Sequence, residues 1–190
     1  MRVVQNSVDG VFCATPQMQV QENTVFHVTA HFSGRKGHPK GGWYVLELAK
    51  RMPDVTFYVA GKTEKIAYLP ENVHLLGEIT DRAQLADHYR RAKLTVLTSR
   101  RETFSMPCAE SLCCGTPVVG FRAGGPEGIA LADYSEFVEF GNLDALETAV
   151  RRWLQEKPDR EATAKEAGMA YGSVAMVEAF LEVYRGLLWK

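Results

Sequence analysis

Residues 94–120 read LTVLTSRRETFSMPCAESLCCGTPVVG, a segment in which two short apolar runs flank a helical stretch. The first run, Leu94–Thr98, and the second, Thr116–Gly120, each predict a strand. Pro107 suits the first turn of a helix, where its missing N–H breaks no hydrogen bond, and Gly115 suits the left-handed residue that ends one. A strand, a helix and a second strand in this order are typical of a parallel sheet with a crossover helix.

The same alternation runs from Thr24 to the end of the chain. Four more segments predict strands: Thr24–Phe32, Val55–Ala60, Val73–Leu76 and Phe137–Phe140. Helical spacing and capping residues predict helices at Gly42 to about Met52, Asp81 to about Ala92, Pro126–Ala132, from Asn142, and Arg160–Trp189 with a break at Tyr171–Ser173. The sequence predicts an α/β fold, a Rossmann-like three-layer α/β/α sandwich with a six-stranded, mostly parallel sheet. We expect residues 24–190 to form this domain, and residues 1–23 to be an interdomain linker or a peripheral segment.

The composition is that of an ordinary globular domain. Of the 190 residues, 46% are hydrophobic and 24% are charged, and the net charge of −1 gives no indication of nucleic-acid binding. No apolar run approaches the ~18 residues of a membrane span, and the first eleven residues lack the basic start of a signal peptide. The four cysteines and five histidines lack metal-ligand spacing. We therefore expect a cytoplasmic protein with no membrane span, no metal and no nucleic-acid partner.

The loop after the first predicted strand has the residues of an anion site. Residues 34–42, GRKGHPKGG, combine four glycines with Arg35, Lys36 and Lys40 directly before a helix. Glycines allow close backbone approach, helix N-termini offer free N–H groups, and basic side chains neutralise a phosphate. The spacing matches neither G-x-G-x-x-G nor the P-loop. The alternative interpretation is a solvated basic turn.

Two further clusters follow later strands. Glu102 and Glu110 lie eight positions apart in RETFSMPCAE, and each carboxylate could accept hydrogen bonds from a pair of sugar hydroxyls, with helix-start amides between them. The alternative for Glu110 is a structural role, because the helix dipole favours an acidic residue near a helix N-terminus. Gly124 and Gly125 allow close backbone approach, or simply form a turn.

In this order the clusters resemble the C-terminal, nucleotide-sugar-binding domain of GT-B glycosyltransferases, in particular family 4 of the retaining enzymes (glycosyl transferases group 1). Residues 102–120 are similar to the family's E-x7-E signature and the Cys-Gly-Thr-Pro-Val-Val strand after it. Supporting similarities are Gly34-Arg35 with Lys40-Gly41, Leu76-Gly77-Glu78-Ile79, Gly124-Gly125, and Asn6-Ser7-Val8-Asp9, which resembles the linker entering this domain.

The resemblance implies roles for individual residues in binding an NDP-sugar donor without metal or other cofactor. The implied catalytic residues are Arg35 and Lys40, which would hold the diphosphate, and Glu102, which would hold hydroxyls of the transferred sugar. Glu110 would hold the ribose, and the backbone near Glu78 and Ile79 would meet the base. The implied substrate-binding residues also include Gly34, Phe104, Ser105, Met106, Gly124 and Gly125. Two positions depart from the family pattern: Ser105 stands where glycine is usual, and Gly-Gly-Pro-Glu is one residue shorter than usual, which leaves Glu127 unassigned.

The resemblance also implies a second, acceptor-binding domain before this one, and only the linker precedes the first strand here. We therefore expect hexosyl transfer to an acceptor such as a glycan or a lipid-linked sugar, in glycan biosynthesis, to be absent or weak in this chain alone. Apolar residues at the end of the last helix, including Leu188 and Trp189, predict a homodimer of the isolated domain. The alternatives are a non-catalytic nucleotide-binding module, a GT-B sugar-nucleotide epimerase and a flavodoxin-like signalling domain.

Overall fold

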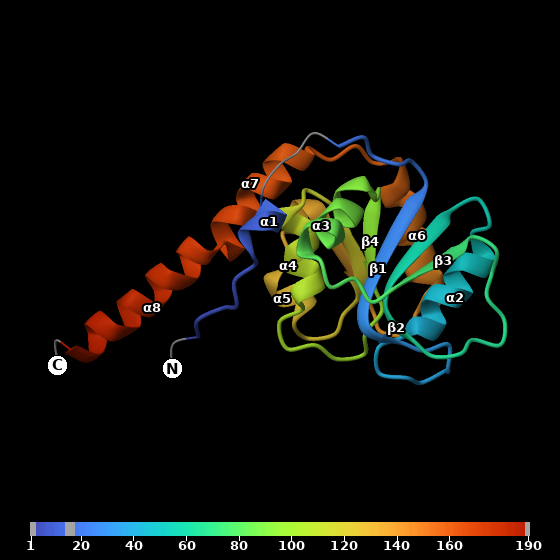
Figure 1. Ribbon diagram of the computed structural model, residues 1–190, viewed down its shortest axis with the longest axis horizontal. Coiled ribbons are helices and arrows are strands. Elements are labelled where there is room, and N and C mark those ends of the chain that lie inside the picture. Colours follow the sequence, from blue (N-terminus) through green and yellow to red (C-terminus); the bar gives the residue numbers. More distant parts are fainter. Residues whose placement is uncertain (1–2, 14–17, 189–190) are drawn as a thin grey trace.

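Six strands form one sheet in the order β3-β2-β1-β4-β5-β6, and every pairing between them is parallel (Figure 1). The computed structural model describes residues 3–13 and 18–188. The strands are β1 (Thr24–Phe32), β2 (Thr56–Thr63), β3 (Val73–Gly77), β4 (Leu94–Leu97), β5 (Val118–Phe121) and β6 (Ser135–Val138). This order is that of a doubly wound Rossmann sheet, in which the order of strand addition reverses between β1 and β4. The predicted six-stranded, Rossmann-like α/β sandwich is therefore confirmed.

Helices cover both faces of the sheet (Figure 1). One core lies beneath α2 (Gly42–Arg51) and α6 (Leu143–Gln155). The opposite core is formed with α1 (Gly10–Cys13), α3 (Arg82–Arg91), α4 (Met106–Cys113), α5 (Pro126–Ile129) and α7 (Arg160–Tyr171). A 3-10 turn at Ala132–Tyr134 leads into β6, and α8 (Ser173–Leu188) ends the described chain.

Short polar side chains begin three of these helices. The Asp81 carboxylate accepts hydrogen bonds from the amides of Ala83 and Gln84, at 2.8 and 3.4 Å, and so caps α3. Asn142 caps α6 in the same way, and Asp159 caps α7. Such caps satisfy N–H groups that have no partner within the helix. The helix starts predicted at Asp81 and Asn142 are confirmed.

Three predicted strands differ from the structure by two or more residues at an end: β2, β6, and β5, which begins at Val118 rather than at Thr116. β2 continues through Gly61, where the sequence suggested an end. A Cβ at Gly61 would lie 2.0 Å from the carbonyl oxygen of Thr29, so the glycine permits close approach at an irregularity of β1. β6 begins at Ser135 and ends before Phe140, whose ring packs against Tyr44 and Phe121 beyond the strand. The helix predicted at 126–132 divides into α5 and the 3-10 turn.

The described N-terminal segment packs onto the domain. Val8 and Phe12 are 1% and 2% exposed within the core on the α3–α4 side. The amide of Val8 donates a 2.7 Å hydrogen bond to the carbonyl of Tyr171, at the end of α7. Residues 3–13 therefore contribute to the core of the domain, and their identity as an interdomain linker stays a prediction.

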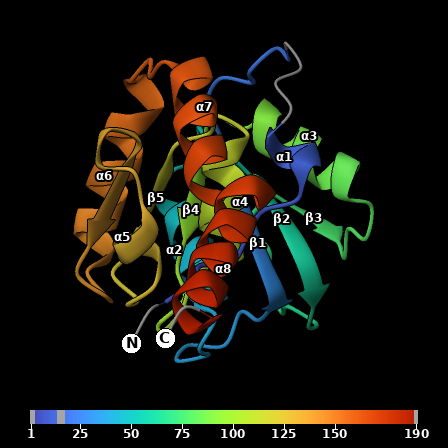
Figure 2. The ribbon, with the colours of Figure 1, turned by 90° about the vertical axis from the view of Figure 1, so that its left-hand side faces the viewer.

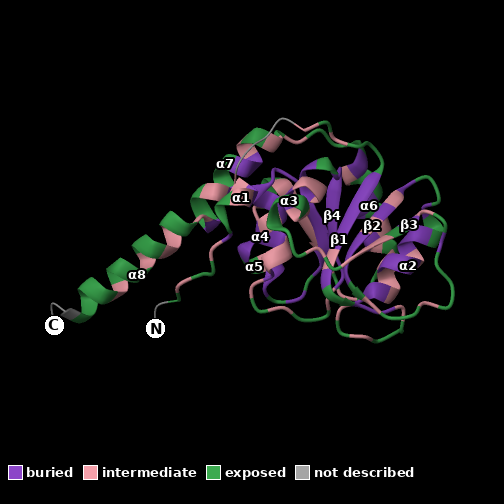
Figure 3. Cartoon of the chain, viewed as in Figure 1, coloured by how far each residue is buried: buried purple, intermediate pink, exposed green. Residues whose placement is uncertain are grey.

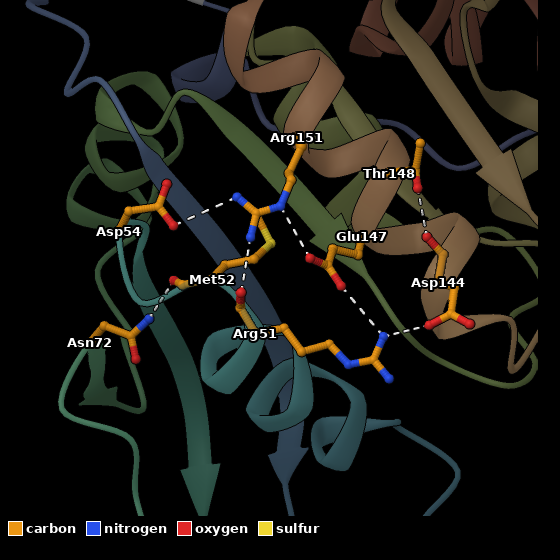
Figure 4. Close-up of polar contacts among 8 residues, drawn as sticks. All are labelled: Arg51, Met52, Asp54, Asn72, Asp144, Glu147, Thr148 and Arg151. Atoms are coloured by element: carbon orange, nitrogen blue, oxygen red, sulfur yellow. Dashed lines mark hydrogen bonds and ion pairs between the residues drawn. The ribbon is translucent and has the colours of Figure 1, made fainter.

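A polar network joins α2 to α6 (Figure 4). Arg51 contacts Asp144 and Glu147 through Nη1, at 2.5 and 3.4 Å. Arg151 contacts Glu147 at 3.1 Å and donates to the carbonyl of Arg51 at 2.9 Å. Asn72 donates to the carbonyls of Ala49, Met52 and Val55, and so ties the segment before β3 to the end of α2.

The last helix leaves the body of the domain. The predicted break falls at Gly172, after which α8 extends away from the sheet beyond α7 (Figures 1 and 2). Most of α8 is exposed (Figure 3), including the apolar side chains of Val174, Val177, Phe180, Leu181, Tyr184 and Leu187. Trp189 lies outside the described residues. None of the helices in the described part of the chain is long and apolar enough to span a bilayer.

Candidate functional site

A cavity of about 270 Å³ opens where β1 and β4 end, at the point where the order of the sheet reverses. Ligands bind at this place in open α/β sheets because the loops after neighbouring strands diverge there. We call it the Lys40 cavity. It is lined by Asn6, residues 27–30, Lys40, residues 97–99 and 102–107, Phe121, Ala123 and Pro126.

Lys40 and Glu102 meet in this cavity. The Lys40 ammonium donates a 2.8 Å hydrogen bond to Oε1 of Glu102, and both side chains are partly buried, at 34% and 23% exposed. Lys40 comes from the loop before α2, and Glu102 from the loop between β4 and α4. The next residue, Gly41, has φ 68°, and a Cβ there would lie 1.9 Å from the carbonyl oxygen of Thr98. Only glycine allows the two loops to approach this closely.

The glycine pair after β5 packs against the segment that carries Glu102. The amide of Glu102 donates to the carbonyl of Ala123 at 2.9 Å, and Glu102 forms a parallel bridge with Gly124. A Cβ on Gly125 would lie 2.7–2.8 Å from the backbone of residues 102–104. Glu127, unassigned by sequence, accepts hydrogen bonds from the amides of Ala123 and Gly124, at 2.9 and 2.8 Å. Gly125 and Glu127 therefore fix the position of Glu102.

The start of α4 forms another wall of the Lys40 cavity, through Phe104, Ser105 and Met106. Ser105 precedes the helix with φ 75° and ψ 81°, a left-handed conformation that is unfavourable for a residue with a side chain. This explains physically why glycine suits the position better. The N-terminus of α4 carries the positive end of the helix dipole and faces the same cavity as Lys40.

A second cavity, of about 280 Å³, adjoins the first, and we call it the Glu110 cavity. The two share Val28, Thr29, Ala30, Met106 and Pro107. The second is lined further by Leu85, residues 60–62, Glu78, Ile79 and Glu110. The two glutamates of the E-x7-E segment therefore face separate but adjoining spaces, with the first turn of α4 between them.

Glu110 is held by a buried tyrosine. The Tyr89 hydroxyl, on α3, donates a 3.1 Å hydrogen bond to Oε2 of Glu110, and Tyr89 is fully buried. Burial raises the pKa of Glu110 above its usual value, although this hydrogen bond and the charge of Arg82 oppose the shift. Tyr89 thus orients one carboxylate oxygen and leaves the other for a hydroxyl donor in the cavity.

Gly34 and Arg35 line a third cavity, of about 340 Å³, together with residues of α2 and of the segment after β2. The Arg35 side chain is exposed, and its charge is one of the factors that lower the pKa of Glu64. The structure therefore brings Lys40 to Glu102 but places Arg35 at a different cavity. The role of Arg35 stays a prediction.

Sequence reasoning missed His27, because histidines were considered only at metal-ligand spacing. His27 is 2% exposed, lines the Lys40 cavity, and has Nδ1 2.9 Å from the carbonyl oxygen of Val96. A carbonyl only accepts, so Nδ1 carries the proton and Nε2 is an acceptor. Among the described residues, Nε2 has no hydrogen-bond partner. Burial lowers the pKa of His27 to about 4. The sequence feature that could have pointed to His27 is that it is a histidine within the apolar run of β1.

Known proteins share both this sequence and this fold. The family Glycosyl transferases group 1 matches residues 17–168. D-inositol 3-phosphate glycosyltransferase 1 of Catenulispora acidiphila is 36% identical over 109 residues, which cover 55% of this chain and 26% of that protein. The chain thus spans about a quarter of the length of such curated relatives.

Two solved structures illustrate the shared fold. The lipopolysaccharide outer core galactosyltransferase WaaB, in its apo form, matches with a TM-score of 0.78 at 16% identity, over 97% of this chain and 55% of its own. The HepE protein of Anabaena, solved in complex with UDP, matches with a TM-score of 0.68 at 20% identity, over 87% of this chain and 49% of its own. At these identities the likeness is one of fold. The match over residues 17–168, together with the Rossmann-like fold found in GT-B glycosyltransferases, establishes that this chain belongs to the glycosyl transferases group 1 family.

Proposed function

We propose that this chain binds the nucleotide-sugar donor of a hexosyltransferase. The observation that carries the proposal is the contact between Lys40 and Glu102 in a cavity that adjoins the one containing Glu110. The Lys40 cavity holds a cation, Lys40, and a hydrogen-bond acceptor, Glu102, and the Glu110 cavity holds a second hydrogen-bond acceptor. These groups match the chemistry of an NDP-sugar. Its diphosphate is anionic, whereas its sugar and its ribose each present hydroxyl donors.

In this proposal the donor lies across the first turn of α4. The diphosphate contacts Lys40 and the N-terminal amides of the helix, and the transferred sugar occupies the Lys40 cavity. Glu102 accepts hydrogen bonds from its hydroxyls, and the lone pair of His27 Nε2 offers a further acceptor. The ribose hydroxyls reach Glu110, and the base reaches the backbone at Glu78 and Ile79 in the Glu110 cavity.

Lys40 would assist departure of the nucleoside diphosphate. Negative charge develops on the leaving diphosphate as the glycosidic bond breaks, and a positioned ammonium and helix N-terminus stabilise that charge. We therefore propose transfer without a metal ion and, from the family resemblance, with retention of anomeric configuration. Arg35 joins this group only if the exposed side chain turns toward the diphosphate on binding.

Transfer also needs an acceptor, for which we propose a glycan or a lipid-linked sugar in glycan biosynthesis. Holding both reactants together can supply ~7–11 kcal/mol of the barrier. The matched residues cover 26% of the Catenulispora acidiphila relative, so we expect donor binding by this chain alone and little or no transfer. The free thiols of Cys13, Cys108, Cys113 and Cys114 favour a reducing compartment, which we propose is the cytoplasm.

Calorimetric titration of the purified chain with UDP, GDP and ADP in EDTA tests donor binding. We expect one nucleotide to bind, and Lys40→Ala and Glu110→Ala to weaken it at least tenfold, since a charge-assisted contact contributes roughly 1.5–3 kcal/mol. Lys157→Ala removes an exposed lysine on another face and serves as the control. The proposal fails if no nucleotide binds, if binding requires magnesium, or if all three variants bind alike.

A further inference from the structure

A group of metal-ligand side chains lies outside both cavities, at the rim of the sheet. His31 is near the end of β1, His38 is in the loop before α2, and Glu64 follows β2. One ligand atom from each lies within 4.8 Å of the other two. The three residues come from separate elements, which explains why no sequence spacing indicated them.

Hydrogen bonds already orient these side chains. Nε2 of His31 is 3.0 Å from Oε1 of Glu64, and the Ser33 hydroxyl donates to Oε2 of Glu64 at 2.7 Å. The backbone amide of Lys40 lies 3.4 Å from Nδ1 of His38. The Ser33 hydroxyl, which holds one oxygen of Glu64 and leaves the other free, is a supporting contact of the kind found around metal ligands in many proteins.

The charge at the site is mixed. The Glu64 carboxylate, which accepts hydrogen bonds from Ser33 and His31, is the one acidic side chain of the group. The positive charge of Arg35 acts on the same carboxylate and opposes binding of a cation. The Arg35 side chain is exposed, however, and water screens its charge.

Two imidazoles and one carboxylate are a ligand set that suits zinc rather than magnesium or calcium, which prefer oxygen ligands. With metal–ligand bonds of about 2.0–2.2 Å in a tetrahedron, neighbouring ligand atoms lie roughly 3.3 Å apart. A spread of 4.8 Å or less therefore has to contract by at most about 1.5 Å. The side chains of His31 and Glu64 are 46% and 42% exposed, which leaves room for that movement.

We propose that His31, His38 and Glu64 bind one zinc ion, with solvent in the fourth position. The three ligands line neither of the proposed donor cavities, so the ion would not contact the donor. It acts on the loop instead: bound zinc ties His38, two residues before Lys40, to the ends of β1 and β2. Because the ion binds only the folded arrangement, it stabilises the domain against unfolding.

Titration of the tag-free, EDTA-stripped chain with ZnCl₂ in a calorimeter tests the site, with a melting curve at each zinc concentration. We expect one bound zinc per chain, a raised Tm, and no equivalent response to MgCl₂. His38→Ala and Glu64→Gln should each weaken zinc binding at least tenfold and remove the increase in Tm. His74→Ala removes another exposed histidine, outside the group, and should bind zinc like the wild type.

Melting of each metal-free variant checks that the substitution leaves the fold intact. The proposal is overturned if the wild type binds no zinc. It is also overturned if His38→Ala and Glu64→Gln bind as tightly as the wild type, which would place the ion elsewhere, for example at a thiol. Neither result bears on nucleotide binding, which is measured in EDTA.

Discussion

The ammonium group of Lys40 lies 2.8 Å from Oε1 of Glu102, although 62 positions separate the two residues in the sequence. Each charge is therefore balanced by the other before any ligand enters the cavity. A diphosphate would compete for Lys40, whereas sugar hydroxyls would compete for Glu102. The ion pair therefore couples binding of the donor's diphosphate, at Lys40, to binding of its sugar, at Glu102.

Glu102→Gln tests this link. Removing the carboxylate frees Lys40, so a nucleoside diphosphate without a sugar should bind as tightly as to the wild type, or up to about fivefold more tightly, as expected for a partly exposed ion pair. The intact nucleotide sugar should lose affinity relative to the diphosphate. Calorimetry with both ligands measures this ratio. A tenfold loss of diphosphate affinity would contradict the competition between ligand and carboxylate.

Gly125→Ala should disturb the site by overpacking against the segment that carries Glu102. Its Cβ would lie 2.7–2.8 Å from the backbone of residues 102–104, and overpacking of this kind costs typically 1–3 kcal/mol of unfolding free energy. Gly128→Ala, in the same short helix, meets no atom within 4 Å and should change stability by less than about 0.5 kcal/mol. Urea unfolding of both variants measures the difference. Equal stabilities would show that the loop accommodates the methyl group.

Ser105→Gly should stabilise the protein. The left-handed conformation costs a residue with a side chain about 1–2 kcal/mol, and the greater freedom of glycine in the unfolded chain offsets roughly half of the gain. We expect a net increase of about 0.5–1 kcal/mol in the free energy of unfolding. Ser105→Ala, which keeps the unfavourable φ, should give no such increase. If Ser105→Gly destabilises the protein, the contacts of the serine side chain contribute more to the free energy of unfolding than its left-handed backbone conformation costs.

The buried His27 predicts a specific pH dependence of stability. The folded protein keeps His27 neutral down to about pH 4, whereas the unfolded chain binds a proton near pH 6.5. The unfolded state therefore holds more protons between these values, so stability rises with pH across this window and is lost as pH falls from 6.5 toward 4. The full shift corresponds to about 3 kcal/mol.

Chemical denaturation of the wild type and of His27→Gln at several pH values from 4 to 7 measures this contribution. The variant cannot titrate at this position, so its stability should decline less steeply with falling pH, whatever its absolute value. Parallel pH profiles for the two proteins would mean that His27 is protonated in the folded state as readily as in the unfolded one.

The apolar side of α8 predicts self-association of the isolated chain. Phe180, Leu181 and Tyr184 are 42%, 43% and 56% exposed, and contiguous apolar surface of this kind favours association. Sedimentation velocity should detect dimers that Phe180→Ser combined with Tyr184→Ser abolishes. Substitution of Glu178, on the same helix, by Ser serves as the control. A wild-type chain that sediments as a monomer at every concentration would refute this prediction.

Local sequence signals predicted the architecture well. Alternation of apolar runs with helical spacing gave six strands, and Asp81, Asn142 and Gly115 marked helix ends because capping chemistry depends on single residues. Loops after neighbouring parallel strands meet at one edge, so the approach of the Lys40 loop to the Glu102 loop also followed from the order of elements.

Other features depend on packing between segments that are far apart, which local patterns do not encode. The polar N-terminal stretch gave no sign that Val8 would pair with Tyr171. The direction of the exposed Arg35 side chain depends on its surroundings in the folded loop. His27 Nδ1 is hydrogen-bonded and Nε2 is left without a partner because β4, with Val96, lies beside β1 among the described residues.

The first turn of α4 separates two spaces that have only five lining residues in common. If a nucleotide sugar spans both, substitutions at Glu78 or Leu85 would alter the choice of nucleobase, whereas substitutions at Thr103 or Phe121 would alter the choice of sugar. Evolution, or protein engineering, could then change the preferred nucleobase while keeping the preferred sugar, or the reverse.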